Sequence, residues 1–178
     1  MKKLAVFFTL CVFASQLYGQ VSHGLPVNAQ GQIEFSEVFH LEGVSKERIY
    51  NACKRFIYSN YKSESITLDD MDIMLSTSNN IPFTCSMISS TVYSMAFNLS
   101  LEFKESRCRL QLNQFVFTSP VTSYDAESLF SNQTFRKRNG DLKKPYDCYR
   151  SQMLFQVITL SDNFYKFLVN ELNKDSDW

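Results

Sequence analysis

The chain has 178 residues, and its 18 basic residues are balanced by 18 acidic residues, so its formal net charge at pH 7 is zero. This balance excludes a protein that attracts nucleic acid or another polyanion through its overall charge. The length suits a single domain, whose core at this size is stable without bound metal or a dense set of disulfides.

The first 19 residues predict a signal peptide. Lys2 and Lys3 precede an apolar run over residues 4–14, and a short stretch then ends at the small residue Gly19. This order is typical of secretory signals, and the run is shorter than the roughly 20 residues that cross a bilayer. We expect cleavage near Gly19, export to the periplasm or the cell exterior, and no transmembrane segment. The mature chain then has 16 basic and 18 acidic residues, a net charge of 16 minus 18, or −2.

A strand and a helix joined by a tight turn are the first predicted elements. Residues 33–41 alternate apolar and polar side chains, which is the period of a half-buried strand. Glu37 is the charged exception on the apolar face. Gly43 then permits a turn, and Ser45 is placed to cap a helix. Apolar residues three and four apart predict its buried face: Ile49, Ala52, Cys53, Phe56 and Ile57.

Two short strands around an acidic turn are predicted next. They cover residues 66–68 and 73–77, and the phase of the apolar residues changes between them, as a turn requires. The turn holds Asp69, Asp70 and Asp72. Residues 81–87 then alternate again and predict a further strand.

The clearest pattern is a β-hairpin formed by residues 93–103 and 108–118. The apolar face of the first strand carries Tyr93, Met95, Phe97, Leu99, Leu101 and Phe103. That of the second strand carries Cys108, Leu110, Leu112 and Val116. A turn at residues 104–107 brings Phe103 opposite Cys108, Leu101 opposite Leu110 and Leu99 opposite Leu112, so that the two apolar faces coincide.

Residues 119–147 predict a long loop, because Pro120, Gly140 and Pro145 interrupt any regular pattern. Within it, residues 125–130 fit a helical turn. A loop of this length is either functional or mobile. We expect Asp147 to cap a final amphipathic helix, which Ser161 and Asp162 are placed to interrupt or kink. The predicted buried stripe of this helix is Leu154, Val157, Ile158, Leu160, Phe164, Phe167, Leu168 and Leu172.

These elements predict one α+β domain over residues 20–178. Its order is a strand, a helix, a run of antiparallel strands and a helix, written β-α-β-β-β-β-α. We expect a curved antiparallel sheet with the two helices packed on one of its faces.

Four features of the chain together match a known pattern: "LPVNAQGQIEFSEVFHLEGVSKERIYNACKRFI", "ITLDD", "LEFKESRCRLQLNQF" and the C-terminal amphipathic helix. In these features the chain resembles an exported bacterial family of domains of unknown function that is described as having a TATA-binding-protein-like fold. It implies that fold but no catalytic residues, because the family has no assigned activity. DNA binding does not follow from it, since a fold does not imply a function.

No convergent set of catalytic residues is visible. Gly43 alone is far from a phosphate-binding glycine pattern, so it is interpreted as a turn residue. A small periplasmic hydrolase that uses Glu37, His40 or the aspartates is the alternative to a non-catalytic protein. His40 fits a surface histidine, and Glu37 fits pairing with a cation or a place at a sheet edge. No metal site and no cofactor are predicted.

Four cysteines follow the signal peptide: Cys53, Cys85, Cys108 and Cys148. An even number in an oxidising compartment predicts disulfides, but four cysteines allow three pairings and the sequence does not choose among them. Buried free thiols are the alternative.

The long loop supplies the candidate binding residues. They are Tyr124, Phe130, Phe135, Arg136, Arg138, Lys143 and Lys144. The aromatic residues either fold back onto the core or face a partner, and the basic residues of 136–144 are either solvated or bind a polyanion. We therefore expect a non-catalytic module that binds a protein partner or an amphiphilic ligand through this loop and the uncovered face of the sheet. Nucleic acid is not expected, and the oligomeric state stays open.

Overall fold

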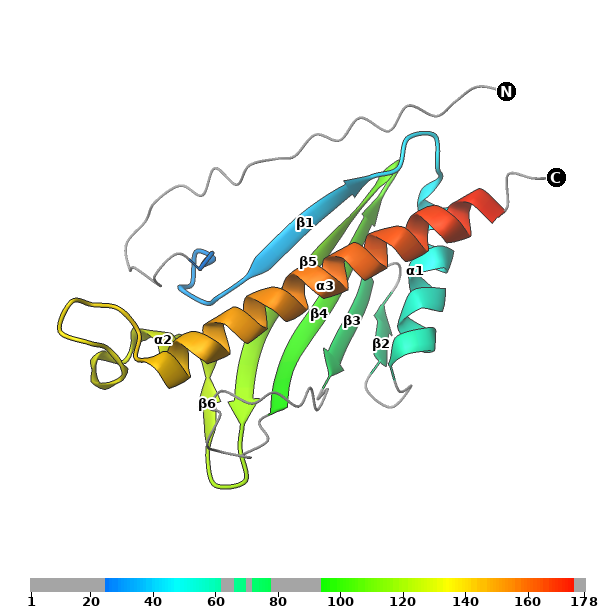
Figure 1. The fold of residues 1–178 in the computed structure, drawn as a ribbon. Helices are drawn as coiled ribbons and strands as arrows, with labels where there is room; N and C mark the ends of the chain where they lie inside the picture. Colours follow the sequence, from blue (N-terminus) through cyan, green and yellow to red (C-terminus); the bar gives the residue numbers. More distant parts are fainter. Residues whose placement is uncertain (1–24, 62–65, 70–71, 78–93, 175–178) are drawn as a thin grey trace.

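The computed structural model describes residues 25–61, 66–69, 72–77 and 94–174, and within them an antiparallel sheet is covered on one face by helices (Figure 1). The predicted signal peptide, the predicted strand at residues 81–87, Asp70 and Cys85 lie outside the described residues. No helix in the described part is long and apolar enough to cross a bilayer.

The sheet has the order β1-β5-β4-β3-β2, and β6 pairs with the far end of β5. The strands are β1 (Phe35–His40), β2 (Ile66–Asp69), β3 (Asp72–Thr77), β4 (Ser94–Lys104), β5 (Arg107–Thr118) and β6 (Ser123–Asp125). All of these pairings are antiparallel. The α+β class and the antiparallel sheet agree with the prediction, while β6 and a short helix after it were not part of the predicted order.

The β4–β5 hairpin has the predicted register. Phe103 pairs with Cys108, Leu101 with Leu110, and Leu99 with Leu112. These six side chains are all buried, because strand side chains alternate between faces and the chosen register places both apolar sets under the helices.

The placement of Val116 on the buried face was wrong. A register shift interrupts the β4–β5 pairing between Ala96 and Asn98. On β5, Gln114 adopts φ 53°, a left-handed conformation that reverses the alternation of the strand. Phe115 and Phe117 are therefore buried in place of Val116.

Helix α1 (Lys46–Asn60) follows the prediction residue by residue. The Ser45 side chain caps it by accepting a hydrogen bond from the Arg48 amide, and Gly43 makes the preceding turn with φ 74°. Its buried residues are Ile49, Ala52, Cys53, Phe56 and Ile57. The aromatic and aliphatic groups of this face pack directly on β4 and β5.

Helix α3 (Lys144–Lys174) begins earlier than predicted and is unbroken. Asp147 lies in its first turn and is not the cap. Pro145 is tolerated because the first amides of a helix have no partner within it. Ser161 does not interrupt the helix, since its hydroxyl donates a hydrogen bond to the Glu37 carboxylate. Ile158 was wrongly assigned to the buried stripe and is 60% exposed.

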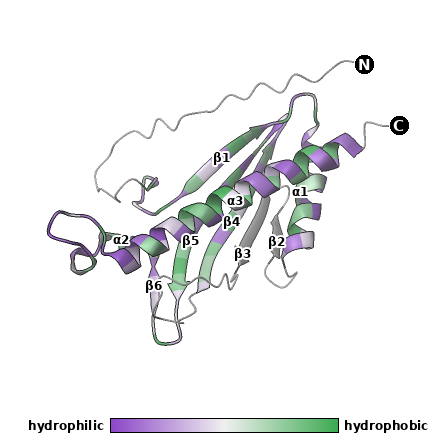
Figure 2. Cartoon of the chain, in the orientation of Figure 1, coloured by the Kyte–Doolittle hydropathy of each residue, from purple (hydrophilic) through white to green (hydrophobic). Residues whose placement is uncertain are grey.

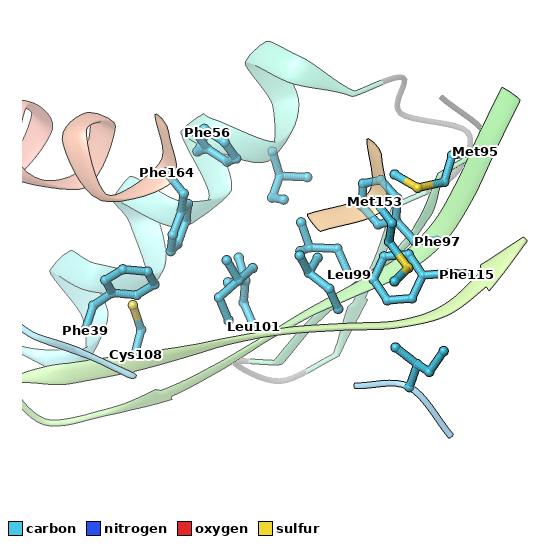
Figure 3. Packing of buried hydrophobic residues seen from close by; sticks show 14 of the residues in the cluster. Phe39, Phe56, Met95, Phe97, Leu99, Leu101, Cys108, Phe115, Met153 and Phe164 are labelled. Atoms are coloured by element: carbon cyan, nitrogen blue, oxygen red, sulfur yellow. The ribbon is translucent and has the colours of Figure 1, made fainter. Parts of the chain in front are cut away.

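The core lies between the sheet and the two long helices. Figure 3 shows Phe164 of α3 between Phe39 and Phe56, with ring centroids 5.4 Å and 5.0 Å away. Phe115, Met153 and Met95 fill the other end of the core. Burial of these large side chains against one another holds the helices on the sheet.

Candidate functional site

The segment predicted as a loop is largely ordered and forms one end of the molecule. After β6 comes α2 (Ala126–Ser131), then a single 3-10 turn, η2 (Gln133–Phe135). The predicted helical turn is thus confirmed, while the prediction of an irregular segment was wrong over these elements. The loop from η2 to α3 extends beyond the sheet (Figure 1).

Helix α2 is fixed to the sheet by its cap and its apolar side. The Asp125 carboxylate accepts a hydrogen bond of 2.6 Å from the Ser128 amide, which caps the helix. Leu129 and Phe130 are fully buried, and Phe130 meets Phe117 of β5 edge to face, with the ring centroids 6.0 Å apart. Phe130 therefore belongs to the core and is not available to a partner.

Three aromatic rings form a row on this end. Phe135 stacks on Tyr146, with ring centroids 4.1 Å apart and planes 14° apart. Tyr124 approaches Phe135 edge to face at 5.9 Å. Tyr124 keeps 38% of its surface exposed. The structure thus brings two predicted binding residues together and adds Tyr146, which sequence reasoning did not single out.

Arg136 is a structural residue. Its side chain is buried and donates hydrogen bonds to the carbonyl oxygens of Phe130 and Gly140, the second at 2.8 Å. Burial, followed by the nearby charge of Arg150, lowers the pKa of Arg136. The guanidinium thus holds the loop against α2, and the prediction that Arg136 lies on a binding surface was wrong.

Four other cations are exposed in the loop that follows Phe135 and at the start of α3: Lys137, Arg138, Lys143 and Lys144. Lys143 also donates a hydrogen bond of 2.7 Å to the carbonyl of Thr134. The single carboxylate of residues 136–144 is Asp141. Figure 2 shows that this loop is mainly hydrophilic. We call the aromatic row and these four cations together the aromatic–basic surface.

The uncovered face of the sheet is polar. On β4 and β5 it carries the residues between the buried ones, among them Asn98, Ser100, Glu102, Arg109 and Gln111. Arg109 and Glu102 form an ion pair of 3.2 Å on this face, and both side chains are 45% exposed. No helix in the described part covers these residues (Figure 1).

The residues of the hydrolase alternative do not converge. Glu37 and His40 lie on opposite faces of β1, because neighbouring strand positions alternate. Glu37 lies on an edge strand, which is one of the two environments predicted for it, and His40 is exposed. Asp69 and Asp72 pair at the opposite edge, four strand spacings from β1, or about 19 Å.

Two of the four disulfide candidates are free thiols. Cys53 of α1 and Cys108 of β5 are both buried and free. Burial, reinforced by the adjacent Cys108, raises the pKa of the Cys53 thiol. Cys148 is disulfide-bonded. In the described part of the chain, His, Cys, Asp and Glu do not gather in a group of three that fits a metal ion.

A shallow cleft between α1 and α3 was not predicted. Lys54 and Arg55 of α1, which are not on its predicted buried face, line it together with Glu171 of α3. No spacing rule links residues 116 positions apart, so only the packing of the two helices reveals this group.

Comparison with known proteins identifies the fold. Residues 35–118 match the model of a family described as "Domain of unknown function (DUF4468) with TBP-like fold". The chain is similar to a TBP-like protein from Parabacteroides distasonis whose crystal structure is known. The two sequences are 16% identical, and the structures superpose with a TM-score of 0.64 over 82% of this chain and 97% of that one. A DUF4468 family protein from Bacteroides ovatus is 19% identical, with a TM-score of 0.63 over 83% of this chain and 89% of that one.

No curated protein matches the sequence. The two similar crystal structures agree with the present one in fold, and the family description agrees with the resemblance seen in the sequence. Residues 35–118 therefore resemble the DUF4468 family of domains of unknown function, and the fold is TBP-like.

Proposed function

We propose that the protein is an exported, non-catalytic interaction module that binds a protein partner through the aromatic–basic surface. The observation that carries this proposal is the row of Tyr124, Phe135 and Tyr146 at the end of the molecule whose loop also carries exposed cations. Export rests on the predicted signal peptide.

The chemistry of this surface is that of a protein interface. Aromatic residues and arginine are enriched at such interfaces, where they supply most of the binding energy. Phe135 and Tyr146 are half-buried and stacked on each other, so little further side-chain entropy is lost when a partner binds. The four cations favour a partner with an acidic patch, because complementary charges speed association and select the orientation.

The wide separation of reactive groups supports a non-catalytic role. Glu37 and His40 face opposite sides of one edge strand, and the acidic turn lies at the other edge. General acid–base catalysis needs its groups within hydrogen-bonding reach of one substrate. The uncovered polar sheet face is the second contact area of the proposal, suited to hydrogen bonds with a partner backbone.

The test is quantitative crosslinking in intact cells of the source organism. The double variant Tyr124→Ala/Arg138→Gln removes one exposed ring and one cation, and Phe155→Ala is the control because Phe155 is 60% exposed on α3 outside this surface. The amount of crosslinked partner recovered with the double variant should fall about tenfold or more, since loss of one interface anchor costs at least about 1–2 kcal/mol of binding free energy. Wild type and Phe155→Ala should recover it equally.

An unchanged set of crosslinks for the double variant would refute the proposal. Circular dichroism of both variants checks that each is folded. Binding of heparin or DNA that falls steeply with salt and requires Arg138 would instead favour the polyanion alternative.

A further inference from the structure

The α1–α3 cleft is a second candidate site, separate from the aromatic–basic surface. Its volume is about 600 Å³, which is within the range of sites for small molecules. It lies near the C-terminal end of α3, whereas the aromatic–basic surface lies at the N-terminal end. From Lys144 to Glu171 the helix rises about 40 Å, so the two places are separate.

A buried carboxylate organises the cations of this cleft. Glu171 is only 8% exposed and forms ion pairs with Arg55 and Lys174, the latter at 2.9 Å. The hydrogen bond from Lys174 is the main influence that holds the pKa of Glu171 below its ordinary value of 4.5. The charges of Lys174 and Arg55 act in the same direction, and burial opposes them. The carboxylate thus stays ionised and keeps both cations at the cleft.

Among the described residues, those lining the cleft carry more positive than negative charge. Lys54, Arg55 and Lys174 line it, and Glu171 is the one carboxylate of this described lining. Lys54 is not among the ion-pair partners of Glu171. A guanidinium has five N–H donors, so Arg55 retains donors when one of its nitrogens serves Glu171. The site therefore offers an ammonium group and part of a guanidinium to an anion.

Aromatic rings stand beside these cations. The Lys54 ammonium lies 6.0 Å from the ring centroids of both Tyr50 and Tyr58. Tyr58 is 47% exposed, and Phe167 of α3 lines the cleft while its ring packs on Phe56 at 5.4 Å. Tyr58 and Phe167 can contact an apolar group while Lys54 and Arg55 contact a charge.

We infer that the α1–α3 cleft binds a small organic anion, a carboxylate or a phosphate that carries one aromatic ring or a short alkyl chain. Its anionic group contacts Lys54 and Arg55, and its apolar part lies between Tyr58 and Phe167. This inference is independent of the proposed protein partner.

The experiment titrates the mature protein with four probes by isothermal calorimetry: phenyl phosphate, phenylacetate, inorganic phosphate and phenol. Phenyl phosphate or phenylacetate should bind saturably below about 10 mM, and whichever binds more tightly names the head group. Inorganic phosphate and phenol, which each supply half of the contacts, should bind at least about tenfold more weakly.

Matched variants locate the binding. Lys54→Gln should weaken the binding of the organic anion about tenfold, because it removes one charged hydrogen bond. Lys166 is exposed on α3 outside the cleft, so Lys166→Gln should leave the affinity for the organic anion unchanged. Tyr58→Ala should reduce the preference for phenyl phosphate over inorganic phosphate.

Three outcomes would overturn the inference. They are the absence of saturable binding by either organic anion, equal affinity for inorganic phosphate or phenol, and equal weakening by Lys54→Gln and Lys166→Gln. Since Lys54 and Lys166 side chains are not in the core, both variants should keep the wild-type unfolding midpoint.

Discussion

Replacement of Glu171 by glutamine should destabilise the protein at neutral pH but not at low pH. The carboxylate is 10% exposed and serves two ion pairs, whereas its partners Arg55 and Lys174 are 54% and 70% exposed. A buried charged hydrogen bond contributes about 1.5–3 kcal/mol. Because the two cations are exposed, solvent screening reduces this contribution. We therefore expect a loss of about 1–2 kcal/mol in the free energy of unfolding for both ion pairs together.

The sign of the pH dependence follows from the lowered pKa of Glu171. A carboxyl group whose pKa is lower in the folded state stabilises the protein above its unfolded pKa, and this contribution is lost as the pH falls through the folded pKa. The difference between wild type and Glu171→Gln should thus be full at pH 7 and shrink progressively below the ordinary value of 4.5.

Urea unfolding followed by circular dichroism measures this difference. With a slope of about 2 kcal/mol per molar urea, the midpoint should fall by about 0.7 M at pH 7. Asp162→Asn is the control, because Asp162 is an exposed carboxylate on the same helix. A midpoint difference that stays constant from pH 7 to pH 3, or that the control reproduces, would refute the role assigned to Glu171.

Two further predictions concern the core. Phe164→Ala should lower the free energy of unfolding by about 3–5 kcal/mol, whereas Phe155→Ala on the same helix should change it by less than about 0.5 kcal/mol, as urea unfolding will measure. In the native protein, iodoacetamide should label neither Cys53 nor Cys108, because both thiols are buried. After unfolding without reductant it should label both of them, and after reduction it should label all four cysteines of the mature chain. Mass spectrometry counts the labelled cysteines in each case.

The controls for these two predictions are internal. Equal losses for Phe164→Ala and Phe155→Ala would contradict the packing of Phe164 between Phe39 and Phe56. Labelling of the native thiols as fast as free cysteine would contradict their enclosure. Cys148 is disulfide-bonded, so labelling of Cys148 in the unfolded, unreduced chain would contradict its bridge.

The elements whose side chains repeat regularly were predictable from the sequence. In the β4–β5 hairpin, matching the two apolar faces determines the register, because a slip by one residue would move every side chain to the other face. In α1 the apolar spacing and the Ser45 cap specify both the buried side and the start. Both predictions depend on local periodicity alone.

The errors arose where a single backbone conformation or a distant contact decides the structure. The left-handed conformation of Gln114 has no signature in residue type, yet it reverses the alternation that had placed Val116 inside. Strand β6 is short and exposed at all three positions, so it shows no period. Arg136 looks like an ordinary loop cation until its carbonyl partners are known.

The neutral net charge of the chain excludes overall attraction to anions but not local attraction. Cations exceed carboxylates at two places, the aromatic–basic surface and the α1–α3 cleft. Charge effects are screened within about 10 Å at an ionic strength of 0.1 M, and these places are about 40 Å apart along α3. Each should therefore act on its own ligand, and substitutions at the two places should have additive effects on anion binding. A marked departure from additivity would mean that α3 couples its two ends.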